Sequence, residues 1–256
     1  MVDSLRGWGA GLRNAVAAWY LSKPPKKLMY QVVKYQQRDK WSHRDLLRLS
    51  HAQATPELAP IFRWVVGADL GERTVAGKGE RAQRQYGSAG ELPAYLAAFE
   101  ELKACTDEKR AASLIVEWGF THEMVPTELK NSKVVWEALL QQMPVTATMR
   151  NLNKLTQLEL LKPFSETQKL VVARITDAEV LKDGRVHPMN VLFALNTYAQ
   201  GRGMRGNLTW TPEQKVVDAL NDAFYTSFGT IEPTGKNHLL ALDVSGSMGS
   251  PIMGKP

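Results

Sequence analysis

The sequence predicts an all-α fold of antiparallel helix pairs, followed at the C-terminal end by the first strand and loop of a second, α/β domain. Three observations support this prediction. Apolar residues recur at helical spacing along most of the chain, capping residues and glycines bound these segments, and one continuous apolar run breaks the pattern near the end. About ten helices of roughly 10–15 residues, joined by short loops, are typical of stacked helix pairs. No strict sequence period accompanies them.

Residues 26–38 show the clearest helical pattern. Apolar side chains that include Leu28 and Val32 fall on one side of this segment, and polar side chains fall on the other. The segment is therefore predicted to be an amphipathic helix with one buried face. Its polar face carries Lys27, Gln31, Lys34 and Arg38.

Capping signals bound the other predicted helices. Ser, Thr and Asp accept hydrogen bonds from free N–H groups at a helix start, proline fits the first turn, and glycine ends the last turn. Residues 67–90, rich in Gly and charge, are predicted to form an irregular connection. The helices bounded in this way are 42–50 (capping box of Ser42 and Asp45), 56–66 (Thr55-Pro56 start, Gly67 end), 92–104, 106–118 (Gly119 end), 133–143 (Ser132 cap), 144–155, one opened by Ser165 and Gln168, 189–200 (Pro188 start, Gly201 end) and 216–228 (211–213 cap).

The last segment departs from the helical pattern. Residues 238–242 form a short apolar run of the kind found in a strand of a buried parallel sheet. The run leads into Asp243, Ser245 and Ser247, whose carboxylate and hydroxyl oxygens are ligands that a hard cation such as Mg²⁺ accepts. An Asp/Ser turn that caps a helix without a metal is the alternative interpretation.

Composition and charge narrow the class of protein. The single Cys105 excludes an internal disulfide framework and any cysteine-rich metal site. The sequence has no apolar run long enough for a transmembrane helix and no signal-peptide core near its start, so a cytoplasmic protein is expected. The net charge is +6, but residues 1–50 carry ten basic and three acidic residues, and the other 206 residues carry −1. Such concentrated positive charge favours an anionic partner, although a solvated helix face would also explain it.

Three basic segments are candidate RNA contacts, because Lys and Arg bind phosphates while aromatic faces stack on unpaired bases. The first segment lies near the N-terminus and has Trp and Tyr residues between its cations. Aromatic residues at helical spacing, however, belong more often to the core than to an RNA surface. The third is a basic loop that meets a predicted helix N-terminus, where free N–H groups favour a phosphate. These segments contain Lys27, Lys34 and Arg38; then Lys130, Lys133, Arg150 and Lys154; and finally Arg185 to Pro188 with His187.

No motif indicates catalysis. Gly201, Gly203 and Gly206 match a dinucleotide fingerprint in spacing, but a helix precedes them where that fingerprint needs a strand. The segment is interpreted as a loop that exposes Arg202 and Arg205. The five histidines lack any metal-ligand spacing, and sequence order supports no Ser–His–Asp arrangement. The chain is therefore not expected to be an enzyme.

Eight motifs follow one another along nearly the whole chain: GWGAGLRNAV (7–16), WSHRDLLRLSH (41–51), MPVTA (143–147), RNL (150–152), VHP (186–188), GRGMRG (201–206), EPTGK (232–236) and DVSGS (243–247). In this order they resemble the Ro ribonucleoprotein autoantigen family. That family joins a TROVE domain, a ring of HEAT-like helical repeats, to a von Willebrand factor A domain. The resemblance implies a TROVE domain over 1–235 that lacks the family's first repeats, and a truncated A domain over 236–256.

The resemblance also implies a function. Family members bind small Y RNAs on the outer surface of the ring and the single-stranded 3′ ends of misfolded noncoding RNAs in its central hole, in RNA quality control. It implies RNA binding without catalysis, an exoribonuclease as a further partner, no membrane or DNA partner, and a metal site at the D-x-S-x-S loop. The family's RNA contacts map to His187, Lys169, Arg174 and the helix of Arg150 and Lys154. The alternative is an α-solenoid protein–protein scaffold whose charge only promotes solubility.

Overall fold

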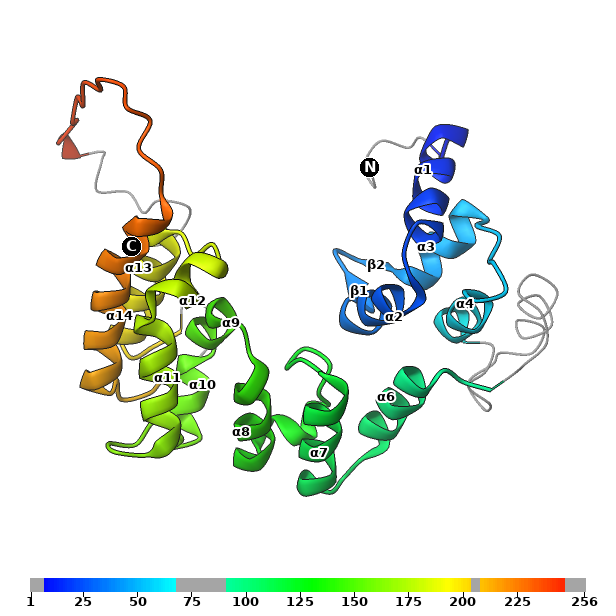
Figure 1. The fold of residues 1–256 in the computed structure, drawn as a ribbon, viewed down its shortest axis with the longest axis horizontal. Coiled ribbons are helices and arrows are strands. Elements are labelled where there is room, and N and C mark those ends of the chain that lie inside the picture. The colour runs from blue at the N-terminus through cyan, green and yellow to red at the C-terminus, as the bar shows by residue number, and fades with distance from the viewer. Residues whose placement is uncertain (1–6, 68–90, 204–207, 247–256) are drawn as a thin grey trace. The chain divides into compact units, whose positions relative to one another are not determined.

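The computed structural model describes residues 7–67, 91–203 and 208–246, and within these ranges the chain is mainly helical (Figure 1). It divides into two compact units, Met1–Lys130 (unit 1) and Asn131–Pro256 (unit 2). The prediction of a mainly helical chain is confirmed, whereas the HEAT-like repeat stays a prediction. In the described residues, no helix combines the length and the apolar character needed to cross a membrane.

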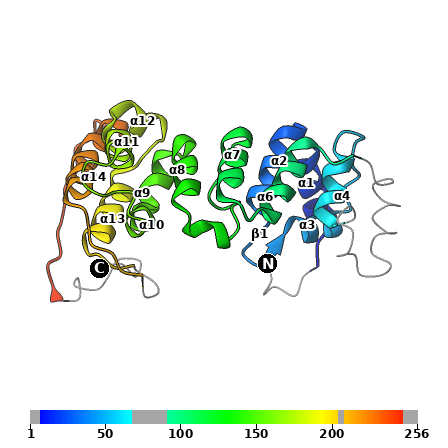
Figure 2. The same ribbon diagram turned by 90° about the horizontal axis from the view of Figure 1, so that it is seen from below.

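Unit 1 packs its helices around an aromatic core, mostly against helices that are not their immediate neighbours in the sequence. Helix α1 contacts α3, α3 contacts α4, α2 contacts both α4 and α6, and α6 contacts α7 (Figures 1 and 2). Tyr20, Phe62 and Phe99 are fully or almost fully buried, which identifies them as core residues. The described elements of the unit are α1 (Ala10–Leu21), α2 (Pro25–Lys34), β1 (Gln37–Arg38), β2 (Trp41–Ser42), α3 (His43–Ser50), α4 (Ala59–Val66), α6 (Ala94–Ala104) and α7 (Glu108–Trp118), and η2 (Glu128–Asn131) lies at the boundary with unit 2.

A short hairpin replaces the end of the helix predicted over 26–38. Helix α2 stops at Lys34, and strands β1 and β2 pair antiparallel. Asp39 and Lys40 join them with positive φ angles of 50° and 68°, which is the geometry of a type I′ turn. The prediction was wrong here because this turn forms without the glycine that usually marks it. Arg38 therefore lies on a strand and not on the helix.

Most of the capping predictions in unit 1 are confirmed. The Ser42 Oγ accepts the Asp45 N–H at 3.2 Å and the Asp45 carboxylate accepts the Ser42 N–H at 3.0 Å, a complete capping box for α3. Gly67, with φ of 77°, ends α4 as predicted. Helix α4 begins only at Ala59, because Thr55 closes a turn over the residues before it. Beyond Gly67, the predicted connection lies outside the described residues.

Unit 2 is built around its last long helix. Helix α14 contacts α11, α12 and α13, and α9 contacts both α11 and α13 (Figures 1 and 2). Val171, Val191 and Leu220 are fully buried at these contacts. The described elements are α8 (Lys133–Gln142), α9 (Val145–Arg150), α10 (Leu152–Gln157), α11 (Glu166–Thr176), α12 (Ala178–Asp183), α13 (Pro188–Ala199), α14 (Gln214–Ser227) and η3 (Phe228–Thr230).

Two helices of unit 2 differ from the prediction. The helix expected over 144–155 is divided at Asn151, whose backbone leaves the helical region and whose side-chain amide donates to the Ala147 carbonyl at 2.8 Å. Helix α12 has no counterpart in the prediction, although Asp177 caps it with bonds to two backbone N–H groups. The caps at Ser132 and Ser165 and the end at Gly201 are confirmed.

The C-terminal strand predicted over 238–242 is not formed in the part of the chain that the structure describes. Leu239 and Leu240 are 97% and 82% exposed, and the segment has no strand partner there. A parallel strand is stabilised by hydrogen bonds to a neighbouring strand and by burial of both faces, and neither condition is met. The apolar run therefore stays an isolated extended segment.

Candidate nucleic-acid interface

A group of cations and aromatic rings lies where α2 runs into the β1–β2 hairpin. The Lys34 ammonium donates to the Tyr30 hydroxyl at 3.3 Å and lies 5.5 Å from the ring centroids of both Tyr30 and Tyr35. The Arg38 guanidinium lies 5.7 Å from the Tyr35 ring, and Lys27 is exposed two turns earlier on α2. We call these five residues the α2 patch. Its rings are only half-buried, so apolar faces and positive charges are presented together.

The segment between α7 and α8 adds further charged groups to this patch. Burial lowers the pKa of Lys34, but its bond to Tyr30 and the nearby Glu123 carboxylate more than offset that effect and raise it. Burial together with the positive charges of Lys130 and Lys34 lowers the pKa of His122, whose Nδ1 lies 3.1 Å from the Glu123 carboxylate. At neutral pH the patch therefore carries its Lys charges beside a neutral His122. Sequence reasoning found Lys130 but missed His122, because a lone histidine has no recognisable spacing.

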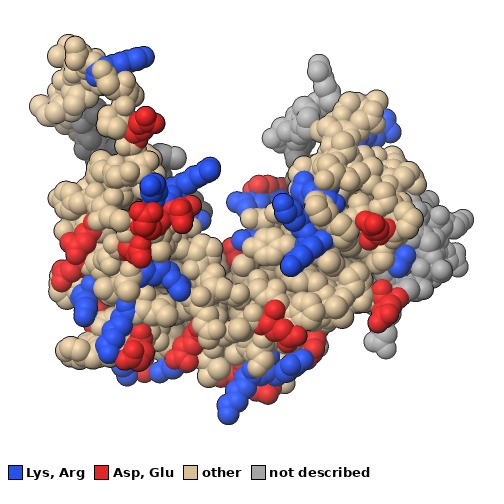
Figure 3. Space-filling model, in the orientation of Figure 1, with Lys and Arg blue, Asp and Glu red and all other residues tan. Residues whose placement is uncertain are grey.

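Among the residues that the structure describes, Lys27, Lys34 and Arg38 of the α2 patch form no ion pair with a carboxylate. Figure 3 shows Lys and Arg side chains gathered over α2 and the hairpin, whereas on the visible surface of unit 2 basic and acidic side chains alternate. Ion pairs with carboxylates in the described ranges are formed by cations elsewhere, among them Lys103, Arg110, Lys133, Lys162 and Lys169. The patch is thus available to an external anion.

Two of the three predicted lysines of unit 2, Lys133 and Lys169, have carboxylate partners. Lys133 pairs with Glu159 at 2.9 Å, and Lys162 shares the same carboxylate at 3.0 Å. Lys169 pairs with Glu166 at 2.7 Å on the same helix. These partners reduce the positive potential that an approaching phosphate meets.

Three other predicted residues of unit 2 have different surroundings. The Lys154 ammonium donates to the Asn131 side chain at 2.7 Å, while Arg150 is exposed at the end of α9. His187 is the exposed N-cap of α13, and its Nδ1 accepts the Met189 N–H at 3.2 Å. The imidazole therefore keeps Nε2 for an external partner, next to a helix N-terminus.

Arg174 contributes to the fold rather than to an open surface. Its guanidinium donates to the carbonyls of Leu140 and Met143 at 2.6 and 3.1 Å, which caps the C-terminal end of α8. Burial lowers its pKa. The structure therefore gives this predicted RNA contact a structural role.

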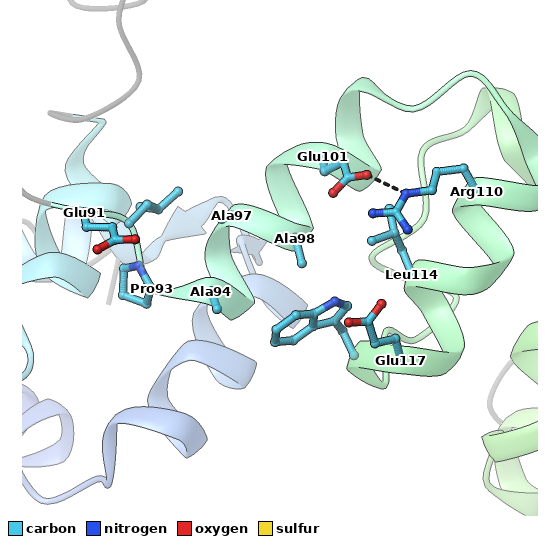
Figure 4. A pocket seen from close by; sticks show the side chains of 11 residues that line it. Glu91, Pro93, Ala94, Ala97, Ala98, Glu101, Arg110, Leu114 and Glu117 are labelled. Atoms are coloured by element: carbon cyan, nitrogen blue, oxygen red, sulfur yellow. Dashed lines mark hydrogen bonds and ion pairs between the residues drawn. The ribbon is translucent and has the colours of Figure 1, made fainter.

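The groove between α6 and α7 is acidic and gives a useful contrast. It has a volume of about 630 Å³ and is lined by three glutamates and by Ala94, Ala97 and Trp118 (Figure 4). Arg110 points to Glu101 across the groove and pairs with it at 2.6 Å, which leaves two further carboxylates in the lining (Figure 4). The groove therefore disfavours phosphates. The three acidic residues are Glu91, Glu101 and Glu117.

The predicted metal loop is only partly described. The Asp243 carboxylate accepts the Ser245 N–H at 2.9 Å in an exposed turn, and hydrogen bonds from Ser245 lower its pKa. Ser247 lies outside the described residues. The residues that the structure describes contain no cluster of three His, Cys, Asp or Glu side chains suited to a metal. The described part of the loop thus offers one carboxylate and one hydroxyl, which are oxygen ligands of the kind that Mg²⁺ accepts, and the metal site stays a prediction.

Comparisons with known proteins give the family. Residues 2–64 and 80–197 match the family described as the TROVE domain. Two similar proteins are both named RNA-binding protein RO60: the Caenorhabditis elegans protein is 39% identical over 99% of this chain, and the Deinococcus radiodurans protein 38% identical over 96%. The crystal structure of the Deinococcus radiodurans RO (RSR) protein is similar with a TM-score of 0.77, at 36% identity over 99% of this chain. This chain spans 44% of the length of each relative and 49% of the crystallised chain. The chain belongs to the TROVE domain family.

Proposed function

We propose that this chain binds RNA through the α2 patch, without catalysing a reaction. The observation that carries the proposal is that the α2 patch places Lys34 and Arg38 beside the Tyr30 and Tyr35 rings, and that within the described residues neither cation forms an ion pair. Cations neutralise phosphates, and half-exposed rings stack on unpaired bases, so this combination suits a single-stranded segment of RNA. The names of the two relatives support RNA as the partner class.

We further propose the RNA class and the cellular role that the Ro resemblance implies. The ligands are small Y-like RNAs and the single-stranded 3′ ends of misfolded noncoding RNAs. The role is RNA quality control in the cytoplasm, with an exoribonuclease as a partner. Divalent-cation binding at Asp243, Ser245 and Ser247 stays a prediction from the sequence.

A gel-shift titration tests the proposal. The probe is a structured RNA hairpin with a single-stranded 3′ tail, compared with the same hairpin without the tail, at several salt concentrations. We expect tighter binding of the tailed RNA, affinity that falls steeply with salt, and RNA that remains intact. Undetectable or salt-insensitive binding would reject the proposal and favour the protein–protein scaffold. Shortened RNA after incubation would reject the non-catalytic role.

A further inference from the structure

A pocket in unit 2 has the composition of a site for a planar aromatic ligand. It has a volume of about 430 Å³ and lies between α9–α10 and α13. Volumes of about 300–1,000 Å³ are usual for small-molecule sites. Phe193 and Trp210, both half-buried, provide aromatic surface, and Met149 and Leu152 line the pocket with buried apolar side chains.

Hydrogen bonds hold the aromatic wall in place. The Trp210 indole N–H donates to the Tyr198 carbonyl at 2.9 Å, and the two rings stack at 6.2 Å with an interplanar angle of 24°. The Tyr198 hydroxyl lies 2.8 Å from the Thr156 hydroxyl and accepts the Glu213 N–H at 3.2 Å. Because these bonds fix Trp210 before any ligand arrives, little side-chain entropy is lost on binding.

Polar groups line the same pocket without internal partners. Within the described ranges, the side chains of Arg150, Asn153 and Asn190 form no hydrogen bond or ion pair with the protein. Asn190 lies three residues before Phe193 on α13, so the two share one face of that helix. Each amide offers both a donor and an acceptor, which is the pattern needed at the edge of a nucleobase.

We propose that this pocket binds one unpaired nucleobase, with the attached phosphate held by Arg150. Stacking on the aromatic wall accepts any base, the Asn153 and Asn190 amides bind its edge, and the exposed guanidinium pairs with the phosphate. None of the described residues that line the pocket is acidic, which favours an anionic ligand here and distinguishes this pocket from the α6–α7 groove. If the bound base is part of an RNA strand, this inference rests on the proposed function. A free mononucleotide would present the same chemistry.

Variants on α13 test the pocket without changing the charge of the protein. Ala194→Phe fills the pocket, and Asn190→Ala removes one amide that lines it. Asn196→Ala is the matched control, because Asn196 is exposed on the same helix and does not line the pocket. Calorimetric titrations of the full chain use a short single-stranded RNA, and in parallel AMP and UMP. Circular dichroism checks that each variant is folded, and Asn190→Ala, an exposed position, carries the test if the filled variant unfolds.

Loss of one stacked base weakens RNA binding on the order of tenfold, so we expect that loss for Ala194→Phe, a smaller loss for Asn190→Ala and none for the control. The salt dependence stays unchanged, since no cation is removed. Equal RNA affinity in all variants would show that the pocket binds no base of the RNA, and it would leave the proposed function intact. If the wild-type protein binds no RNA, mononucleotide binding that the filled variant loses supports the pocket alone. Binding of neither probe overturns both.

Discussion

The basic residues of the two units look alike in the sequence but have different surroundings in the structure. In unit 1, Lys34 and Arg38 lie beside tyrosine rings. In unit 2, Lys133 and Lys169 lie beside glutamates, at 2.9 and 2.7 Å. Exposed ion pairs of this kind contribute little to stability, but they lower the positive potential at the surface. A count of charges therefore does not locate an interface. The interface is located by the residues that each charged side chain contacts.

The largest expected effect tests whether Arg174 of unit 2 stabilises the fold or contacts RNA. Arg174→Ala removes the two hydrogen bonds that the charged guanidinium donates to the C-terminal carbonyls of α8. Loss of both bonds lowers folding stability by about 2 kcal/mol in total. We expect the free energy of unfolding to fall by about that amount, measured by urea denaturation. Lys169→Ala, at an exposed ion pair on the same helix, should change it by less than about 1 kcal/mol. Unchanged stability with weakened RNA binding in Arg174→Ala would place this residue in the interface instead.

The next effect concerns the aromatic part of the α2 patch. Tyr35→Leu keeps apolar bulk but removes the ring beside Lys34 and Arg38, so stacking of about 1 kcal/mol is lost and RNA affinity falls roughly fivefold. The matched control is Tyr225→Leu on α14, where the tyrosine is 67% exposed in unit 2. Affinity measured by gel shift should fall only in the first variant. A larger loss for Tyr225→Leu would move the stacking surface to unit 2.

A smaller effect concerns the histidines of unit 1. Burial lowers the pKa of His43, which shares a hydrogen bond of 2.6 Å with the Tyr20 hydroxyl, and burial also lowers the pKa of His122. The unfolded chain then binds protons more readily than the folded chain, so stability falls as the pH drops below the ordinary histidine value of 6.5. We expect a modest decrease between pH 7 and pH 5.5 in urea titrations, reduced in His43→Gln. Stability that rises over this interval would contradict the burial of these side chains.

The local part of the fold could be predicted from the sequence, and the arrangement of the site could not. Caps such as Ser42 and Ser132 act within a few residues, so their patterns identified the starts of helices. The hairpin was missed because Asp39 and Lys40 adopt positive φ angles, which these two residue types alone do not predict. The break at Asn151 was missed because the bond from its side chain to the Ala147 carbonyl has no sequence signature.

Contacts between residues far apart in the sequence could not be predicted either. The pair of Lys169 and Glu166 follows from their helical spacing, but the pair of Lys133 and Glu159 joins residues 26 positions apart. In the same way, Arg174 meets α8 from a helix more than 30 residues later. Such contacts depend on how helices pack, so sequence reasoning treated all these cations alike.

The most direct test of the account is the salt dependence of RNA affinity in two triple variants of equal charge change. One is Lys27→Gln/Lys34→Gln/Arg38→Gln in unit 1, and the other is Lys133→Gln/Lys162→Gln/Lys169→Gln in unit 2. Each phosphate contact contributes about 0.7 to the slope of log affinity against log salt for single-stranded RNA. We predict that the unit 1 variant loses about 2 from this slope and that the unit 2 variant keeps the wild-type slope. An equal loss in both variants, or a loss only in unit 2, would contradict the account.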